Sequence, residues 1–415
     1  MDEHPKEFLL HLFYRAVAVA LPDKCVPANL QSKPKGRTIV IGAGKASAAM
    51  AAAVEKHWDG PLEGIMITRY GFGQPCDRIE IVEASHPVPD QAGLDAAREM
   101  LRRLEGLTED DLVICLISGG GSALLTLPAD GIDFTDKQAV NAMLLRCGAT
   151  ISEINTIRKH MSAIKGGRLA RACAPAKLVS LIISDVPGDD PSVVASGPTV
   201  PDKSTFADVA KIVAKYNLDL PASVKQHFDA AVDESLGSDD PAFDGNEVKV
   251  IAAARQSLDA AAEAAKAAGI TPIVLGDDVE GEAREVGQDH ARRALAQDGP
   301  CVILSGGETT VTVSGVGKGG RNTEFLMGLM LELNGAPHIH AIACDTDGID
   351  GSEDNAGAYI GPDSLARAQA AGLDPKAFLA NNDAYSFYQA LDNLIITGPT
   401  YTNVNDFRAI LVLPR

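Results

Sequence analysis

Short apolar runs alternate with alanine-rich, periodically polar segments along most of the chain. The first half has strand-like runs at 38–42, 64–71, 78–85 and 111–118, a strand-to-loop unit at 177–188, and helix-like segments at 45–58, 89–107 and 135–173. The second half repeats the pattern, with strand-like runs at 246–254, 271–277 and 301–315, a strand that runs into an acidic loop at 338–351, and helix-like segments at 257–269, 281–297 and about 321–334. Such alternation predicts an α/β protein with mainly parallel strands and helices on both faces of each sheet.

The length of the chain predicts more than one domain. At 415 residues it exceeds what one hydrophobic core usually organises. The segment 233–246, DESLGSDDPAFDGN, is rich in Asp, Gly, Ser and Pro and is the best candidate for a linker. We therefore expect two α/β domains, 1–235 and 245–415, with a ligand cleft between them near the carboxyl ends of the strands.

Charge and cysteine content narrow the class of protein. A formal net charge of −19 argues against a nucleic-acid partner and against an anionic membrane surface, although a local pocket can still be positive. The segment 1–24 contains an apolar stretch that His11 and Arg15 interrupt, which predicts an amphipathic helix. The seven cysteines show no zinc-like spacing, and three lie in apolar runs. Free buried thiols predict a cytoplasmic protein. The three cysteines that lie in apolar runs are Cys115, Cys301 and Cys344.

The first glycine turn, IVIGAGKASAAMA at 39–51, only partly matches a dinucleotide fingerprint. The third glycine would fall at Ser47, and the acid that holds the ribose would fall at 68–70, which reads Thr-Arg-Tyr. A Walker A loop would need glycine in place of Ile39 and a hydroxyl in place of Ala46. The sequence therefore gives no support for a nicotinamide or P-loop site here.

Two cations stand at predicted helix starts after glycines, where they add to the positive end of the helix dipole. Lys45 follows the first strand, and Arg321 follows Gly-Gly in KGGRNTE at 318–324. A shared anion would relieve this charge, so both are candidate catalytic residues, although exposure of the lysine to solvent is an alternative. Lys165 and Arg168 lie near another Gly-Gly pair, but a solvated helix explains them at least as well.

Further glycine turns and acids complete a set of candidate ligand groups. The runs SGGGSALL at 118–125 and ILSGGE at 303–308 follow buried strands and could point backbone amides at phosphate, or could simply be tight turns. Two acidic loops, which resemble no EF-hand, could hold Mg²⁺ by one or two carboxylates plus substrate phosphates, or could be Asp-capped turns. The candidate phosphate-binding residues are Ser118, Gly119, Gly120, Gly121, Ser122, Gly306, Gly307, Asn322 and Glu324. The candidate metal ligands are Asp189, Asp345 and Asp347.

Taken together, these groups indicate phosphoryl transfer, in which positioning and charge stabilisation dominate catalysis. The chain also resembles a known family, from about residue 5 to 412. In order, the motifs that carry the resemblance are VIGAGKAS, CLISGGGSALL, IRKHMSAIKGGRLA, IISDVPGDDPSVVASGPT, LSGGETTVTV, GKGGRNTEF, CDTDGIDG and TGPTYTNVND. As a set they resemble the class II glycerate kinases, whose C-terminal part is the MOFRL domain.

The resemblance implies ATP- and Mg²⁺-dependent phosphorylation of D-glycerate at its 2-hydroxyl by a glycerate 2-kinase. It implies a Rossmann-like N-terminal domain and a smaller α/β C-terminal domain with the active site between them. The family's essential lysine and arginine fall on Lys45 and Arg321. One departure is Tyr401, where glycine is more usual, and it puts substrate preference in question.

The resulting hypothesis has Lys45 and Arg321 neutralising the transferring phosphoryl group and the glycerate carboxylate from opposite walls of a cleft. Asp189 is the expected metal ligand or hydroxyl-positioning base. We expect D-glycerate and ATP as partners, no nucleic acid or membrane, and a monomer or homodimer. Two alternatives are an NAD(P)H-dependent hydroxypyruvate reductase, a name that relatives have carried, and a ligand sensor without catalysis.

Overall fold

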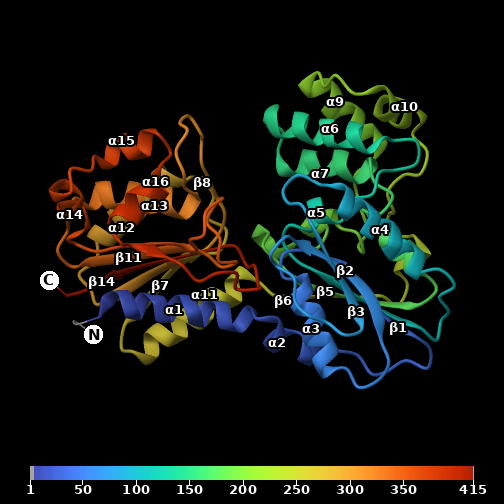
Figure 1. Ribbon diagram of the computed structural model, residues 1–415, viewed down its shortest axis with the longest axis horizontal. Coiled ribbons are helices and arrows are strands. Elements are labelled where there is room, and N and C mark those ends of the chain that lie inside the picture. Colours follow the sequence, from blue (N-terminus) through green and yellow to red (C-terminus); the bar gives the residue numbers. More distant parts are fainter. Residues whose placement is uncertain (1–3, 415) are drawn as a thin grey trace. The chain divides into compact units, whose positions relative to one another are not determined.

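The computed structural model describes residues 4–414, which form two compact units. Unit 1 comprises 4–24, 185–188 and 252–414, and unit 2 comprises 25–184 and 189–251. The predicted α/β class is confirmed, because each unit contains a six-stranded sheet flanked by helices (Figure 1).

The division into units differs from the predicted domains at both ends of the first. Helix α1 (Pro5–Ala20) belongs to unit 1, and strand β6 (Glu247–Ala252) pairs into the sheet of unit 2. The segment 233–246 is also no free linker, because Asp233 accepts from Arg168 Nε at 2.9 Å and the Asn246 side chain accepts from a strand amide at 3.2 Å. The polar side chains of 233–246 therefore form ion pairs and hydrogen bonds within unit 2.

The sheet of unit 2 has the strand order β3-β2-β1-β4-β5-β6. Its strands are β1 (Thr38–Ala43), β2 (Glu63–Arg69), β3 (Ile79–Ala84), β4 (Leu112–Ile117), β5 (Lys177–Ile183) and β6. The pairs from β3 through β5 are parallel, and β1 and β4 are buried along their whole length, as their apolar runs predict. The chain order reverses between β1 and β4, and such a switch point is where doubly wound sheets bind ligands.

Some of the helices of unit 2 form a group with a hydrophobic core of its own. The helices of unit 2 are α3 (Ser47–His57), α4 (Gln91–Arg103), α5 (Gly121–Leu124), α6 (Phe134–Arg146), α7 (Ile151–His160), α8 (Arg168–Cys173), α9 (Phe206–Tyr216) and α10 (Ala222–Ala230), and α2 (Pro22–Cys25) spans the boundary of the units. Helices α6, α7, α9 and α10 share a small core of their own, visible as a helical cluster beside α5 (Figure 1).

The sheet of unit 1 is mixed, which the sequence pattern did not predict. Its order is β13-β12-β11-β14-β9-β7, and β14 lies antiparallel between β9 and β11. The strands of unit 1 are β7 (Thr271–Gly276), β9 (Cys301–Ser305), β11 (Ile339–Asp345), β12 (Gly357–Ile360), β13 (Leu394–Ile395) and β14 (Asp406–Val412), with a separate short pair β8 (Gly281–Glu282) and β10 (Thr309–Thr310).

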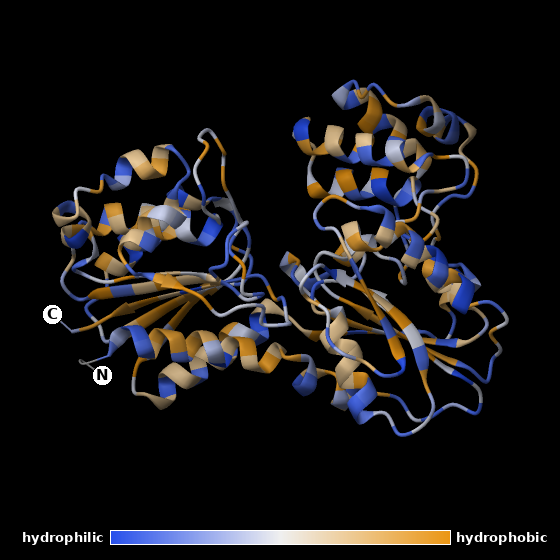
Figure 2. Cartoon of the chain, in the orientation of Figure 1, coloured by the Kyte–Doolittle hydropathy of each residue, from blue (hydrophilic) through white to orange (hydrophobic). Residues whose placement is uncertain are grey.

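Helices cover both faces of this sheet. They are α1, α11 (Ala254–Ala267), α12 (Ala283–Leu295), α13 (Arg321–Leu333), α14 (Ser364–Ala370), α15 (Pro375–Ala380) and α16 (Ala384–Ala390). Val302 and Leu304 pack on the α1–α11 side and Ile303 on the α12–α13 side, because side chains alternate along a strand. Figure 2 shows the apolar strands between these helix layers.

Two further predictions concern the N-terminal helix and the cysteines. In α1, Leu9, Leu12 and Phe13 are buried while His11 and Arg15 are exposed, so the predicted amphipathic helix is confirmed. Within residues 4–414 none of the seven cysteines forms a disulfide, and the three in apolar runs are buried. Across residues 4–414, we find no helix with the length and apolar character needed to cross a membrane.

Candidate functional site

Lys45 lies at the switch point of unit 2, directly after β1. Its amide donates to Gly119 O at 2.8 Å, and the next amide, of Ala46, donates to Ser118 Oγ at 3.0 Å. Helix α3 begins only at Ser47, two residues later than the predicted helix. The loop after β4 thus satisfies the amides that a dinucleotide pyrophosphate would need at this turn.

The end of β2 gives a second structural reason against a dinucleotide at this turn. Thr68 is fully buried, and the Arg69 guanidinium lies over the Phe72 ring at 5.4 Å. The Tyr70 hydroxyl donates to Asp90 Oδ2 at 2.9 Å, and Asp90 caps α4. No carboxylate occupies positions 68–70 to accept from a ribose.

The glycine loop, which we define as 118–122, approaches Lys45 closely. The amides of Gly119 and Gly120 have no partner within 4–414. Gly120 has φ +81°, and a Cβ there would lie 3.2 Å from Lys45 Cγ and from His86 Nε2. Only glycine therefore allows this loop to present open amides beside the lysine and the histidine.

His86 was missed by the sequence analysis. It follows β3, so it lies at the same carboxyl edge of the parallel sheet as Lys45 and the glycine loop. The signal was available, because a histidine directly after a predicted strand is expected at that edge.

The two serines of the glycine loop have different surroundings. Ser118 is fully buried and its hydroxyl accepts from the Ala46 amide, so it supports the turn from inside. Ser122 is half-buried, and its hydroxyl lies 2.9 Å from that of Ser196. Ser196 in turn donates to Asn155 Oδ1 at 3.1 Å. Ser122 therefore donates to Ser196, and of the two serines of the glycine loop its hydroxyl is the less buried.

The predicted residues of unit 1 gather at one edge of its sheet. Strands β9 and β11 both end there, and β14 starts there because it runs antiparallel, with Asp406 opposite Asp345. Gly306 donates its amide to Gly276 O at 2.9 Å, and a Cβ on Gly307 would lie 2.2 Å from Val279 N. The glycines therefore allow close packing of this turn, and the Gly306 amide has a protein acceptor.

Arg321 is the centre of an ion-pair network at this edge. Its Nε donates to Asp406 at 2.9 Å, one terminal nitrogen donates to Asp345 at 3.0 Å and Asn405 at 3.2 Å, and the other contacts Glu308. Although burial opposes its charge, Asp406, Asp345 and Glu308 raise the pKa of Arg321 well above its ordinary value. Glu308 is the most exposed partner, at 51% of its side chain, so an incoming anion would most easily displace Glu308.

The start of α13 explains how the chain tolerates an arginine there. The buried carboxylate of Asp350 accepts from the amides of Asn322 and Thr323, both at 2.9 Å, and from the Thr323 hydroxyl at 2.8 Å. Burial raises the pKa of Asp350, while these hydrogen bonds oppose that shift. The protein's own carboxylates thus balance this helix start, so the charge argument alone did not require a bound anion.

Arg408 was also missed by the sequence analysis, and its side chain hydrogen-bonds to residues at the same edge of the sheet. It is fully buried and donates to Asp406 Oδ2 at 2.6 Å and to Gly306 O at 3.1 Å. Burial lowers the pKa of Arg408, although Asp406 acts in the opposite direction. Its sequence signal is a single charge inside the apolar run FRAILV, where a buried partner is expected.

Asn322 and Glu324 face different partners. Asn322 Nδ2 donates to Asp406 Oδ1 at 2.8 Å. Glu324, only 2% exposed, accepts from Arg284 Nε at 2.8 Å and from Asn382 Nδ2 at 3.0 Å. Its known contacts are therefore structural ones within unit 1, and its predicted role toward a cofactor has no geometric support.

The predicted metal ligands do not form a ready-made cage. No three His, Cys, Asp or Glu side chains within 4–414 are arranged to hold a metal ion. Asp345 and Asp347 are buried neighbours, with the Asp347 amide donating to Asp345 Oδ1 at 3.0 Å. Asp189 belongs to unit 2 and has a left-handed backbone with φ 54°. Carboxylates such as those of Asp345 and Asp347 suit Mg²⁺ that is held partly by substrate phosphates.

Lys165 and Arg168 are buried, so their interpretation as a solvated helix is wrong. Lys165 is 1% and Arg168 6% exposed. Arg168 pairs with Asp233, and Lys137 donates from Nζ to a main-chain oxygen, Leu127 O, at 2.9 Å. The region behind the glycine loop therefore contains buried cations whose polar contacts are largely main-chain carbonyls.

We expect Lys137 to make stability depend on pH. Burial, with Arg158 and Arg168 adding to it, lowers the pKa of Lys137 from 10.5 to about 7. Between these values the unfolded chain holds a proton that the folded chain lacks, so the free energy of unfolding rises with pH from about 7 to 10.5, and this gain is lost as pH falls from 10.5 to about 7. The contribution is about 1.4 kcal/mol per pH unit.

Urea unfolding between about pH 7 and 10 measures this dependence. Lys137→Met should lower the slope of the free energy of unfolding against pH by the amount that one bound proton contributes. Lys211→Met, on the exposed face of α9, should leave this slope unchanged. Parallel curves for the wild type and Lys137→Met would contradict the assignment.

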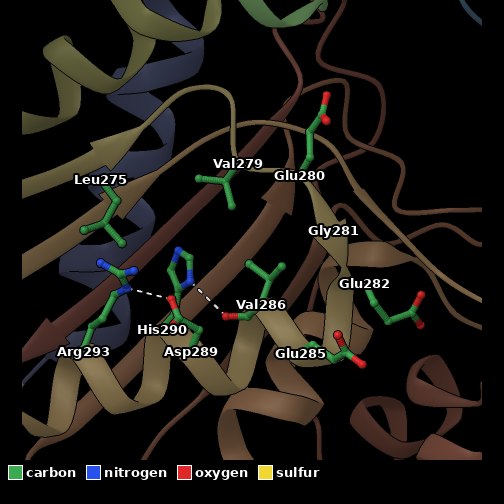
Figure 3. Close-up of a pocket in the computed structure, with 10 residues that line it drawn as sticks. All are labelled: Leu275, Val279, Glu280, Gly281, Glu282, Glu285, Val286, Asp289, His290 and Arg293. Carbon is green, nitrogen blue, oxygen red and sulfur yellow. Dashed lines mark hydrogen bonds and ion pairs between the residues drawn. The ribbon is translucent and has the colours of Figure 1, made fainter. Parts of the chain in front are cut away.

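A pocket of about 460 Å³ lies elsewhere in unit 1, beside α12 (Figure 3). Its charged residues include Glu280, Glu285 and Asp289, and none of the predicted site residues line it. Buried His290 donates from Nδ1 to Val286 O, so its Nε2 accepts from a serine hydroxyl at 3.0 Å. Burial, followed by Arg408, lowers the pKa of His290 to about 4, so the ring is neutral near pH 7.

The fold and these two sheet edges define a two-unit α/β protein with open amides beside a lysine in one unit and a carboxylate-held arginine in the other. Residues 8–229 match a domain of unknown function (DUF4147), and residues 301–406 match the MOFRL family. The chain belongs to the glycerate kinase family that carries the MOFRL domain.

Individual relatives carry two different names. A protein of Agrobacterium vitis, 54% identical, with 99% of this chain and 95% of its own length covered, carries the provisional name hydroxypyruvate reductase. The D-glycerate 2-kinase of Thermotoga maritima is 37% identical, with 97% of both chains covered. The crystal structure of a Thermotoga maritima glycerate kinase has a TM-score of 0.89, at 35% identity, and covers 99% of this chain and 100% of that one.

Proposed function

We propose that this protein is a D-glycerate 2-kinase that transfers the terminal phosphoryl group of ATP to the 2-hydroxyl of D-glycerate. The observation that carries the proposal is the pair of open amides at Gly119 and Gly120 beside Lys45, at the switch point of the unit 2 sheet. Its similarity to the Thermotoga maritima D-glycerate 2-kinase supplies the substrate class.

In this mechanism the open amides and Lys45 bind the phosphates of the nucleotide. They stabilise the charge that develops on the equatorial oxygens during transfer. Arg321 binds the carboxylate of the acceptor, since its planar fork suits a carboxylate, and Glu308 is the partner that the acceptor replaces. Asp189 is proposed to position the hydroxyl or to contact the metal.

We further propose Mg²⁺ as the metal, held by Asp345 or Asp347 together with substrate phosphates. When bound, Mg²⁺ neutralises phosphate charge during transfer. The protein's part is to hold these buried carboxylates in place, and Asp345 is held by its contacts to Arg321 and the Asp347 amide. The seven cysteines, none in a disulfide within residues 4–414, support a reducing, cytoplasmic location.

The reductase alternative has less structural support, whatever the name of the relatives. The first glycine turn donates the amides of Lys45 and Ala46 to the loop after β4, and the end of β2 offers no carboxylate at 68–70 for a ribose. The ligand sensor remains an alternative only if nucleotide binds without turnover.

Paired assays test the proposal. Purified protein with ATP, Mg²⁺ and D-glycerate should release ADP, and phosphorus NMR should identify 2-phosphoglycerate as the product. The same protein with hydroxypyruvate and NADH or NADPH should show no loss of cofactor absorbance. Cofactor oxidation without ADP release would overturn the kinase in favour of the reductase, and ATP binding without ADP release would favour the sensor.

A further inference from the structure

A second loop packs against the glycine loop. We call residues 194–197 the serine loop. Besides the contact between Ser122 and Ser196 at 2.9 Å, a Cβ on Gly121 would lie only 2.7 Å from Ala195 Cβ. Gly121 thus lets the two loops pack directly against each other.

The serine loop has a backbone that must be held by its surroundings. Ala195 and Ser196 have φ of 51° and 63°, in the left-handed region that side chains disfavour. Such residues are conformationally strained and persist where neighbours fix them. Gly166 donates its amide to Ser196 O at 3.3 Å, and Gly167 donates to Gly197 O at 2.9 Å. The segment that follows Lys165 therefore fixes the serine loop.

Lys165 connects both loops through its side chain. Its Nζ donates to Leu125 O at 2.7 Å and approaches Ala195 O at 3.5 Å. The Leu125 amide donates to Gly121 O at 2.9 Å and closes the short helix α5 of the glycine loop. One ammonium group thus contacts Leu125, which ends the short helix that follows the glycine loop, and Ala195 in the serine loop.

The burial of this lysine is energetically unfavourable. Its side chain has no carboxylate partner among residues 4–414. Burial, followed by Lys137 and Arg158, lowers the pKa of Lys165 well below its ordinary value. An apolar side chain of similar length would fill the space without this desolvation cost, so the two carbonyl contacts are the feature that distinguishes a lysine here.

We propose that Lys165 is a positioning residue for nucleotide binding, which holds the open amides of Gly119 and Gly120 in place through the serine loop. It acts through the carbonyl oxygens of Leu125 and Ala195 and does not touch the ligand. The inference rests on the proposed function, in which the glycine loop binds the phosphates of ATP.

Lys165→Met tests the proposal against Lys137→Met as a matched control. Lys137 is also buried and also donates from Nζ to a main-chain oxygen, Leu127 O at 2.9 Å, but within residues 4–414 it makes no hydrogen bond to the serine loop. Lys165→Met should raise the KM for ATP by about tenfold, which corresponds to about 1.4 kcal/mol. Lys137→Met should leave the KM for ATP within about twofold. The KM for D-glycerate should stay unchanged in both.

Equal KM values for ATP in the two variants would overturn the proposal, as would a rise confined to the KM for D-glycerate. If Lys165→Met does not fold, Ser196→Ala takes its place, because it breaks the contact to Ser122 without touching the buried cation. Its KM for ATP should also rise, and an unchanged value would overturn the proposal.

Calorimetric titration of the wild type with ATP separates this inference from the function itself. Absence of ATP binding and of ADP release in the wild type would remove the proposed kinase. A wild type that binds ATP and releases ADP in the presence of D-glycerate, beside a Lys165→Met variant that behaves like Lys137→Met, would remove the positioning role alone.

Discussion

Lys45→Met should lower kcat for phosphoryl transfer by about 10²-fold or more, with the thermal midpoint unchanged. The main chain of residue 45 is fixed by Gly119 O and the next amide by Ser118 Oγ, so the substitution leaves the loop intact and removes only the ammonium. Steady-state kinetics with ATP and D-glycerate, beside a thermal unfolding curve, measure both quantities.

Lys56→Met is the matched control, since Lys56 is exposed in the last turn of the same helix, α3. It should retain wild-type kcat. A Lys45→Met variant of near-normal activity would remove the lysine from the catalytic site.

Arg321→Lys should lower kcat/KM for D-glycerate by about 10²-fold or more, although charge is retained. The guanidinium satisfies Asp406, Asp345 and Glu308 at once, and an ammonium cannot reproduce this planar arrangement of donors. Arg321→Met should lose as much activity and also lower the thermal midpoint, because it leaves buried carboxylates with one partner fewer.

Arg367→Met controls for the loss of an arginine with several contacts in unit 1. Arg367 contacts Asn393, Leu391 and Asp363, outside the predicted site. It should alter the thermal midpoint but not kcat/KM. Wild-type kinetics in Arg321→Lys would show that the arginine is structural.

The sequence predicted the strands of both sheets well where apolar runs are short and β-branched, as in β1 and β4. It predicted no strand at β12, β13 or β14, nor that β14 would lie antiparallel between β9 and β11, because these strand pairs join residues about 60 to 110 positions apart. It also misplaced 233–246 as a linker, since polar composition alone does not reveal an ion pair with Arg168.

The candidate site was predicted in part. The positions of Lys45 and Arg321 after glycines were visible, but the arginine's partners were not recognised as such. Asp406 is 85 residues away from Arg321 in the chain, and Asp350 is 28 residues away from Asn322. Such contacts leave no local periodicity, so sequence reasoning attributed the charge at the start of α13 to a ligand.

The sequence by itself determined the alternation of strands and helices, the glycine turns at strand ends and the cations beside them. These are local properties, set by side-chain period and by the backbone freedom of glycine. Only the tertiary structure decided which amides stay open. It closed those of Lys45, Ala46 and Gly306 and left those of Gly119 and Gly120, because a hydrogen bond between distant segments depends on how the chain packs.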